Sequence, residues 1–167
     1  MKLYHGSSVV VANPQILPSQ TGRTLDFGTG FYTTTSLEQA RRWVSIRQAR
    51  GDCGMGHVSC FDFKAEDARR SGLKWRAFPS ATPEWLDFVM ANRANPAFDH
   101  GFDIVSGPVA NDRVYATLTL FEAGLLDADE TIRRLKTFTL VDQYLFHTEK
   151  ALQFLSFAGS EVVHVQK

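Results

Sequence analysis

Residues 25–43 read LDFGTGFYTTTSLEQARRW and predict a loop, a strand and the start of a helix in immediate succession. The segment 31–35 is aromatic and β-branched, which favours a strand. Ser36 followed three residues later by Gln39 is the capping-box pattern, so we expect a helix from residue 37 to about Arg50. Two glycines precede the strand and would let a ligand approach the backbone closely.

The remaining elements follow from apolar alternation, helix caps and turn residues. Strands and helices interleave irregularly, some connections are too short for βαβ crossovers, and neither GxGxxG nor GxxxxGK[ST] occurs. These features favour an α+β domain with a mixed or split sheet over a Rossmann or P-loop fold. We expect further strands at 2–4, 57–64, 102–106, 143–148 and 161–166, and helices at 85–93, 113–123, 128–138 and 149–157.

The composition indicates one globular domain spanning residues 1–167, with 44% hydrophobic residues spread from end to end. Eighteen basic and eighteen acidic side chains balance, which disfavours obligate binding to nucleic acid or to an anionic membrane surface. No apolar run approaches a bilayer span and the N-terminus lacks a signal-peptide core, so we expect a cytoplasmic protein without membrane partners. Cys53 and Cys60 have no metal-ligand spacing, and no metal is expected.

Three groups of residues could carry chemistry. His5 lies with Gly6 and Ser7 at the expected end of the first strand, where a flat polar ring could be clamped. Tyr32 follows the glycine-punctuated loop, and Trp43 lies eleven residues later on the expected helix, so the two rings could sandwich a planar heterocycle. Taken singly, each residue also fits an ordinary role, as a strand-end histidine bonded to a carbonyl or as a core aromatic.

Gln143 opens the strand expected at 143–148, which places a polar side chain at the rim of the sheet. An amide there could contact a sugar hydroxyl, although the same residue would suit a simple turn. In a loop after another strand, Asn111 and Asp112 could assist a site or hold their own turn.

In combination these segments resemble the three motifs of the ADP-ribosyltransferase superfamily, in its His-Tyr-Glu branch that includes poly-ADP-ribose polymerases and diphtheria-type toxins. The first motif is LYHGS at 3–7, the second is GFY at 30–32 with Trp43, and the third is DQYLF at 142–146. The stretches LDFGTGFYTTTSLEQARRW, FDIVSGPVANDRVY and DQYLFHTEKALQFL also resemble a bacterial family of unknown function grouped with these enzymes. The resemblance covers nearly the whole chain.

The resemblance implies a split β-sandwich with peripheral helices and NAD+ bound as substrate between its halves, with no metal. His5 would bond a ribose, the backbone of Gly6 would hold the carboxamide, and Ser7 would assist. Tyr32 and Trp43 would stack on the nicotinamide. The reaction would cleave the nicotinamide-ribose bond and pass ADP-ribose to an acceptor.

The chain departs from the family pattern at Gln143, where the family has a glutamate. An amide brings no negative charge, so the cationic ribose would be less stabilised. A carboxylate at Asp112, Asp142 or Glu149 could compensate, or the enzyme is slow, or the protein only binds NAD+. Val141 lacks the carboxylate or amide found in arginine-modifying relatives, which makes arginine a poor acceptor.

The expected function is therefore an NAD+-dependent ADP-ribosyltransferase that modifies a protein or nucleic acid, as a bacterial toxin or defence effector with a possible antitoxin or inhibitor partner. The alternatives are a non-catalytic module that binds NAD+ or ADP-ribose, and an NAD+ glycohydrolase. A hydrolase built on His147 or His57 with a cysteine is a weaker alternative, because no motif joins them. The arginines at 41, 42, 47 and 50, and the basic residues at 133, 134 and 136, would form either an acceptor patch or solvated helix faces.

Overall fold

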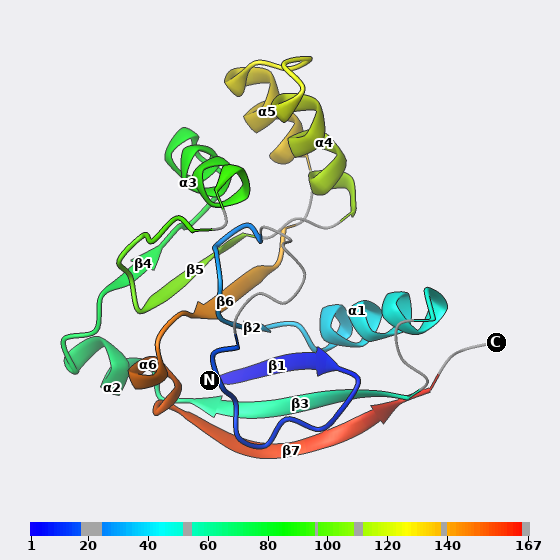
Figure 1. Ribbon diagram of the computed structural model, residues 1–167, viewed down its shortest axis with the longest axis vertical. Helices are drawn as coiled ribbons and strands as arrows, with labels where there is room; N and C mark the ends of the chain where they lie inside the picture. The colour runs from blue at the N-terminus through cyan, green and yellow to red at the C-terminus, as the bar shows by residue number, and fades with distance from the viewer. Residues whose placement is uncertain (18–24, 52–54, 96, 109–111, 138–139, 165–167) are drawn as a thin grey trace.

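The computed structural model describes residues 1–17, 25–51, 55–95, 97–108, 112–137 and 140–164. Within these ranges seven strands form one mixed sheet, in the order β4-β5-β6-β2-β1-β3-β7, and six helices accompany it (Figure 1). Every neighbouring pair of strands is antiparallel except β4 and β5. The strands are β1 (Lys2–Ser7), β2 (Phe31–Thr34), β3 (Gly56–Phe63), β4 (Trp75–Ala77), β5 (Ile104–Pro108), β6 (Asp142–Phe146) and β7 (Leu155–Val163).

The sheet consists of two parts that meet at β1 and β2. We call β1, β3 and β7 with helix α1 (Leu37–Ala49) the long-strand half. The short-strand half consists of β2, β6, β5 and β4 with helices α3 (Pro83–Ala94), α4 (Asp112–Glu122) and α5 (Ala128–Leu135). All six residues of β1 are in register with β3, whereas β1 and β2 align only at Tyr4 and Thr34. The two halves therefore share a single row of the sheet, which we call the junction.

Helix α1 begins at Leu37, as the Ser36 cap predicts, and covers the long-strand half. The Ser36 hydroxyl accepts the Gln39 amide hydrogen at 3.2 Å, which satisfies one of the free N–H groups at the helix start. Ala40 and Val44 are buried beneath the helix. Gly6 lies directly below them, because a Cβ there would stand 2.7 Å from the Ala40 carbonyl oxygen.

Three helices cover the short-strand half: α3 (Pro83–Ala94), α4 (Asp112–Glu122) and α5 (Ala128–Leu135). Thr82 caps α3 through Trp85 N–H, which confirms the helix start predicted from its Thr-Pro-Glu sequence. Trp85 is fully buried and donates its indole N–H to the Pro108 carbonyl at 3.1 Å. This contact ties the helix layer to the end of β5.

A second core lies on the opposite face of the sheet, around Leu3, Phe61, Phe63 and Phe146. The short helices α2 (Ala65–Arg70) and α6 (Glu149–Leu152) lie near one end of this region (Figure 1). Adjacent residues of β6 serve both cores, since Leu145 belongs to the helix-covered core and Phe146 to the opposite one. The sheet is thus packed on both faces near its centre.

Several boundaries differ from those expected. The first strand extends to Ser7 instead of ending at Tyr4, and the helix expected to reach residue 138 ends at Leu135. The helix expected at 149–157 is shorter and stops at Leu152, and the strand expected at 161–166 begins earlier, since β7 occupies 155–163. Strand β7 forms there because it pairs along the whole of β3. This partner is distant in the sequence, so local strand propensity does not reveal the pairing. Helix α2 and strand β4 were not predicted.

Candidate functional site

The candidate residues lie on three adjacent central strands, in the order β6-β2-β1. Tyr4 of β1 is in register with Thr34 of β2, and Thr34 is in register with Gln143 of β6. Neighbouring strands are about 4.8 Å apart, so the backbones of Gln143 and Tyr4 are separated by about 10 Å. Three segments that are distant in the sequence therefore meet at the junction.

The imidazole of His5 bridges the two halves where β1 and β2 part. Its Nδ1 lies 2.7 Å from the Tyr32 carbonyl oxygen, and its ring centroid lies 4.5 Å from that of Phe31. A carbonyl can only accept, so Nδ1 carries the proton and Nε2 of the neutral ring is an acceptor. Burial lowers the pKa of His5, the bond to Tyr32 opposes this shift, and the positive charge of Arg47 adds to it. The ring is therefore neutral at neutral pH.

His5, Gly6 and Ser7 lie within β1 rather than beyond its end. Their partners on β3 are Ser59, Val58 and His57. No register with β2 continues beyond Tyr4 within the described chain, so the β2-facing edge of this segment has no partner strand. The Ser7 hydroxyl donates to the Val9 carbonyl at 2.5 Å, which engages it in a local turn.

Tyr32 is held in place by its hydroxyl group. That hydroxyl donates to the Gly28 carbonyl at 2.5 Å and accepts the Phe27 amide hydrogen at 3.2 Å. The ring is partly buried against the helix-covered core, and burial raises the pKa of its phenol. The geometry provides a fixed aromatic surface next to the junction.

Two histidines hold the loop that precedes Tyr32. His100 Nε2 lies 3.1 Å from the Phe27 carbonyl, and His147 Nδ1 lies 2.5 Å from the Thr29 carbonyl. The two imidazole rings contact each other with centroids 4.5 Å apart. His147, considered above as a base for a hydrolase, is thus engaged with the backbone of this loop.

An ion network anchors the same loop to the helix layer. Arg93 of α3, only 8% exposed, pairs with Asp26 at 3.1 Å and with Glu122 of α4 at 2.5 Å. Burial alone would lower the pKa of Arg93, but the two carboxylates outweigh it and raise that pKa. Sequence reasoning missed this network because its three members are distant in the chain and none belongs to a motif.

Trp43 projects from α1 and is 55% exposed. The structure describes both Trp43 and Tyr32, and their rings make no aromatic contact with each other. The two rings that were expected to sandwich a heterocycle are therefore not already paired. Other large apolar side chains, such as Tyr115 and Phe157, are also exposed, so exposure alone does not mark Trp43 as functional, but it leaves the ring accessible to a ligand.

Gln143 lies between Thr34 on β2 and Gly107 on β5 and is partly buried. Its carboxamide makes no hydrogen bond to any residue that the structure describes. Strand alternation places Gln143 and Tyr32 on the helix-covered face and His5 on the opposite face. A ligand that contacts all three must therefore enter where β1 and β2 part.

The carboxylates that could replace the missing charge at Gln143 are in different surroundings. Glu149 accepts the Ile16 amide hydrogen at 3.0 Å and so holds the N-terminal loop. Asp142 is exposed at the start of β6. Asn111 lies outside the described residues, as does Cys53, and Asp112 begins α4 with a side chain that is not described.

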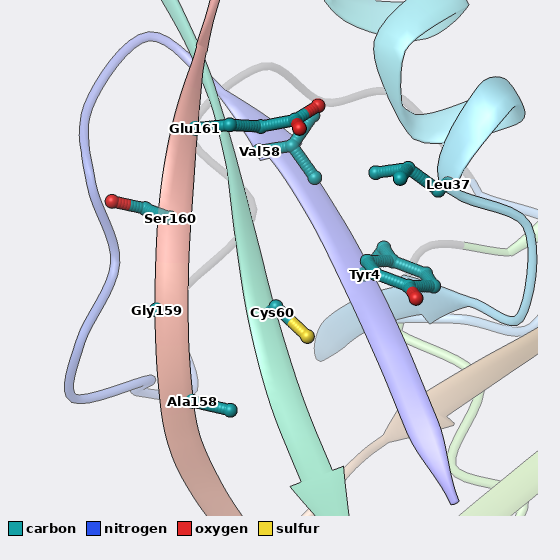
Figure 2. Close-up of a pocket in the computed structure, with 8 residues that line it drawn as sticks. All are labelled: Tyr4, Leu37, Val58, Cys60, Ala158, Gly159, Ser160 and Glu161. Atoms are coloured by element: carbon teal, nitrogen blue, oxygen red, sulfur yellow. The ribbon is translucent and has the colours of Figure 1, made fainter.

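A groove of about 280 Å³ lies on the long-strand half (Figure 2). Tyr4, Leu37, Val58 and Cys60 line one side of it, and residues 158–161 of β7 line the other. Burial raises the pKa of the Cys60 thiol. The groove borders the junction at Tyr4, but His5, Tyr32 and Gln143 do not line it.

Across the described ranges, no cluster of three or more His, Cys, Asp or Glu side chains is arranged to hold a metal ion. None of the helices in those ranges combines the length and apolar character needed to cross a bilayer.

The comparison with known families matches residues 1–157 to the family described as "Protein of unknown function (DUF3990)". The chain belongs to this family. The match spans β1, β2 and β6, and it therefore includes every candidate residue named above. A search of curated proteins found no match to this DUF3990 member.

Proposed function

We propose that this protein is an NAD+-dependent ADP-ribosyltransferase with the split β-sandwich that the sequence resemblance implies. The observation that carries the proposal is that His5, Tyr32 and Gln143 lie on three adjacent strands, each within two residues of the one row, Tyr4-Thr34-Gln143, that joins the two halves of the sheet. The motif residues are far apart in the sequence, and a ligand at the junction could reach all three.

The chemistry of these residues suits NAD+. Neutral His5 offers Nε2 as an acceptor for a ribose hydroxyl. Tyr32 offers a fixed ring for stacking on nicotinamide, and the exposed ring of Trp43 lies on the helix that packs over Gly6. The β2-facing edge of 5–7 offers backbone groups to the carboxamide.

In the reaction the bond between the ribose C1′ and the nicotinamide nitrogen breaks. Nicotinamide leaves as a neutral molecule with the bonding electron pair, and positive charge develops on the ribose. The acceptor nucleophile then bonds to C1′ and loses its proton. Gln143 would accept a hydrogen bond from the ribose 2′-hydroxyl and orient the sugar.

The neutral side chain of Gln143 favours one alternative function. Without a carboxylate the developing positive charge is less stabilised, by about 1 kcal/mol or more. The protein could then bind NAD+ or ADP-ribose without turning it over. An NAD+ glycohydrolase, with water as acceptor, follows from the same site if no macromolecule is modified.

The acceptor we propose is a protein or a nucleic acid, and the biological setting is a bacterial toxin or defence effector that acts in the cytoplasm with an antitoxin or inhibitor partner. Arg133 and Arg134, which could have formed an acceptor patch, both pair with Glu130, at 2.6 and 2.8 Å. Arg41 pairs with Glu161. These pairs reduce the positive charge available to a nucleic acid at both places.

The test is incubation of the purified protein and a bacterial lysate with NAD+ labelled in its adenylate part, followed by separate protease and nuclease digestion. We expect labelled macromolecule whose amount falls in Gln143→Ala and is unchanged in Gln153→Ala, an exposed glutamine beyond α6. Nicotinamide release without labelled macromolecule would indicate the glycohydrolase. Binding of NAD+ without nicotinamide release would indicate the binding module, and no binding would refute all three.

A further inference from the structure

The contacts of α1 define which way each side of the helix faces. Val44 points at the sheet beneath it. Arg41 bonds Glu161 of β7 at 2.7 Å, and Gln48 Nε2 donates to the Val163 carbonyl of β7 at 3.1 Å. With about 100° per residue, Arg41 and Gln48 lie roughly 40–60° to one side of Val44. That side of the helix faces β7.

Trp43 and Arg47 lie on the other side of α1. From Val44 they are rotated by about 100° and 60° in the opposite direction, and as residues i and i+4 they are neighbours on the helix surface. Because β2 lies on the other side of β1 from β3 and β7, this side of α1 faces the junction. Arg47 therefore lies on the junction side of the helix, and its charge reaches the imidazole of His5, which bonds the Tyr32 carbonyl.

The surroundings of Arg47 leave its guanidinium available. Arg47 is partly buried, yet it forms no ion pair with any residue in the described ranges, in contrast to Arg41 and Arg93. Its charge acts on the imidazole of His5, which agrees with its position over the junction. A partly desolvated cation without a carboxylate partner is a suitable site for an anion.

We propose that Arg47 binds the diphosphate group of NAD+ while Trp43, its neighbour on the same side of α1, covers a ring of the dinucleotide. This inference rests on the proposed function and adds the residue that recognises the anionic part of the substrate. The planar guanidinium can donate two parallel hydrogen bonds to phosphate oxygens. The assignment predicts selectivity for ligands that contain the diphosphate.

The experiment compares three probes on the intact protein. NAD+ contains both the nicotinamide and the diphosphate, ADP-ribose contains only the diphosphate, and nicotinamide contains only the ring. Affinities are measured by NMR shift titration, which reads constants from micromolar to millimolar. The variants are Arg47→Gln, Arg47→Lys and Tyr32→Ala, with Arg133→Gln as a control for the loss of one exposed positive charge.

We expect Arg47→Gln to weaken NAD+ and ADP-ribose by about tenfold or more and to leave nicotinamide unchanged. Tyr32→Ala should show the reverse selectivity, with weaker NAD+ and nicotinamide but unchanged ADP-ribose. Arg47→Lys keeps the charge near the helix C-terminus and should recover part of the affinity, while Arg133→Gln should match the native protein.

An equal loss for all three probes in Arg47→Gln would assign Arg47 a structural role at the end of α1 and overturn the inference, as would no loss at all. Both results leave the proposed function intact, since the native protein binds NAD+ in each. If the native protein binds neither NAD+ nor ADP-ribose, the proposed function itself fails, and the inference fails with it.

Discussion

The two halves of the sheet are built differently. The long-strand half has strands of six to nine residues and one covering helix, and its sheet face stays open beside α1 as a groove. The short-strand half has strands of three to five residues, three covering helices and the ion network around Arg93. The candidate residues are divided between them, because His5, Gly6, Ser7 and Trp43 belong to the first half and Tyr32 and Gln143 to the second.

This division shows what the junction must do. A ligand that contacts residues of both halves depends on their relative position, which the shared row of the sheet, the His5 bond and the core that joins Phe61 to Phe146 maintain. The groove of the long-strand half, by contrast, is lined by that half alone. The groove can thus form within the long-strand half alone, whereas the candidate site at the junction requires both halves.

The largest expected effects test whether the halves unfold together. Trp85→Ala in the short-strand half and Phe61→Ala in the long-strand half each remove a fully buried aromatic side chain, and each should lower the free energy of unfolding by about 3–5 kcal/mol. Because β6 contributes to both cores, we expect one urea transition in each variant, coincident by circular dichroism and tryptophan fluorescence. Two separate transitions in Phe61→Ala would show that the halves are independent.

Tyr32→Ala should remove the aromatic contact that the short-strand half makes with nicotinamide. The substitution deletes both the ring and the bonds to Phe27 and Gly28, and we expect nicotinamide release to fall more than about 100-fold, a change of about 2.7 kcal/mol. Phe157→Ala, which removes an exposed aromatic ring of β7, is the control for loss of an aromatic side chain. A folded Tyr32→Ala protein with the native release rate would remove Tyr32 from the site.

Gly6→Ala tests the long-strand side of the junction. The new Cβ would stand 2.7 Å from the Ala40 carbonyl oxygen and 2.8 Å from Val44 Cγ2, so α1 must shift, at a cost of about 1–3 kcal/mol. Gly107→Ala meets the Cβ of Phe78 at 2.9 Å in the other half and serves as a comparable clash. We expect thermal denaturation to show a lower melting temperature in both variants. Titration with NAD+ should show the larger loss of affinity in Gly6→Ala. Equal losses of affinity would argue against a role for α1 in binding.

Gln143→Glu should increase the contribution of β6 to catalysis. A carboxylate would stabilise positive charge on the ribose, and we expect nicotinamide release to rise by about tenfold, equivalent to about 1.4 kcal/mol. Glutamate at the exposed Gln153 provides the control for added charge. A fall in the release rate, with NAD+ affinity retained, would mean that the amide hydrogens of Gln143 are needed as donors.

The smallest effect concerns pH and involves one histidine from each half. The folded pKa values of His5 and His100 are lowered, chiefly by burial, so the unfolded chain binds more protons as the solution is acidified. Their contribution to stability is complete above the unfolded pKa of about 6.5 and is lost as pH falls through the lower folded values. Urea unfolding at pH 7.5 and 5.5 should show lower stability at pH 5.5, with a smaller difference in His5→Asn and in His100→Asn. A stability that rises on acidification would contradict these pKa directions.

Local signals predicted the elements that begin with a clear cap. The Ser36 and Thr82 caps placed α1 and α3 correctly, because a cap is a contact between residues three apart. The C-terminal segment failed for the opposite reason, since β7 depends on its pairing with β3, far away in the chain. In the candidate site, the sequence named His5, Tyr32 and Gln143, but neither the His5 bond to the Tyr32 carbonyl nor the loop contacts of His100 and His147 could be read from it.

The amino-acid sequence alone predicted a fold of mixed strands and helices, the balanced charge, the capped helices and the residue types of the three segments that resemble the ADP-ribosyltransferase motifs. Its membership of the DUF3990 family came from comparison. Only the tertiary structure decided that β1, β2 and β6 are neighbours, that His5 spans the junction, and that Arg47 lies on the junction side of α1 with no carboxylate partner among the described residues. The physical reason is range. Caps and alternation act over a few residues, whereas strand order, buried ion networks and the orientation of α1 come from contacts between segments that burial brings together from distant parts of the chain.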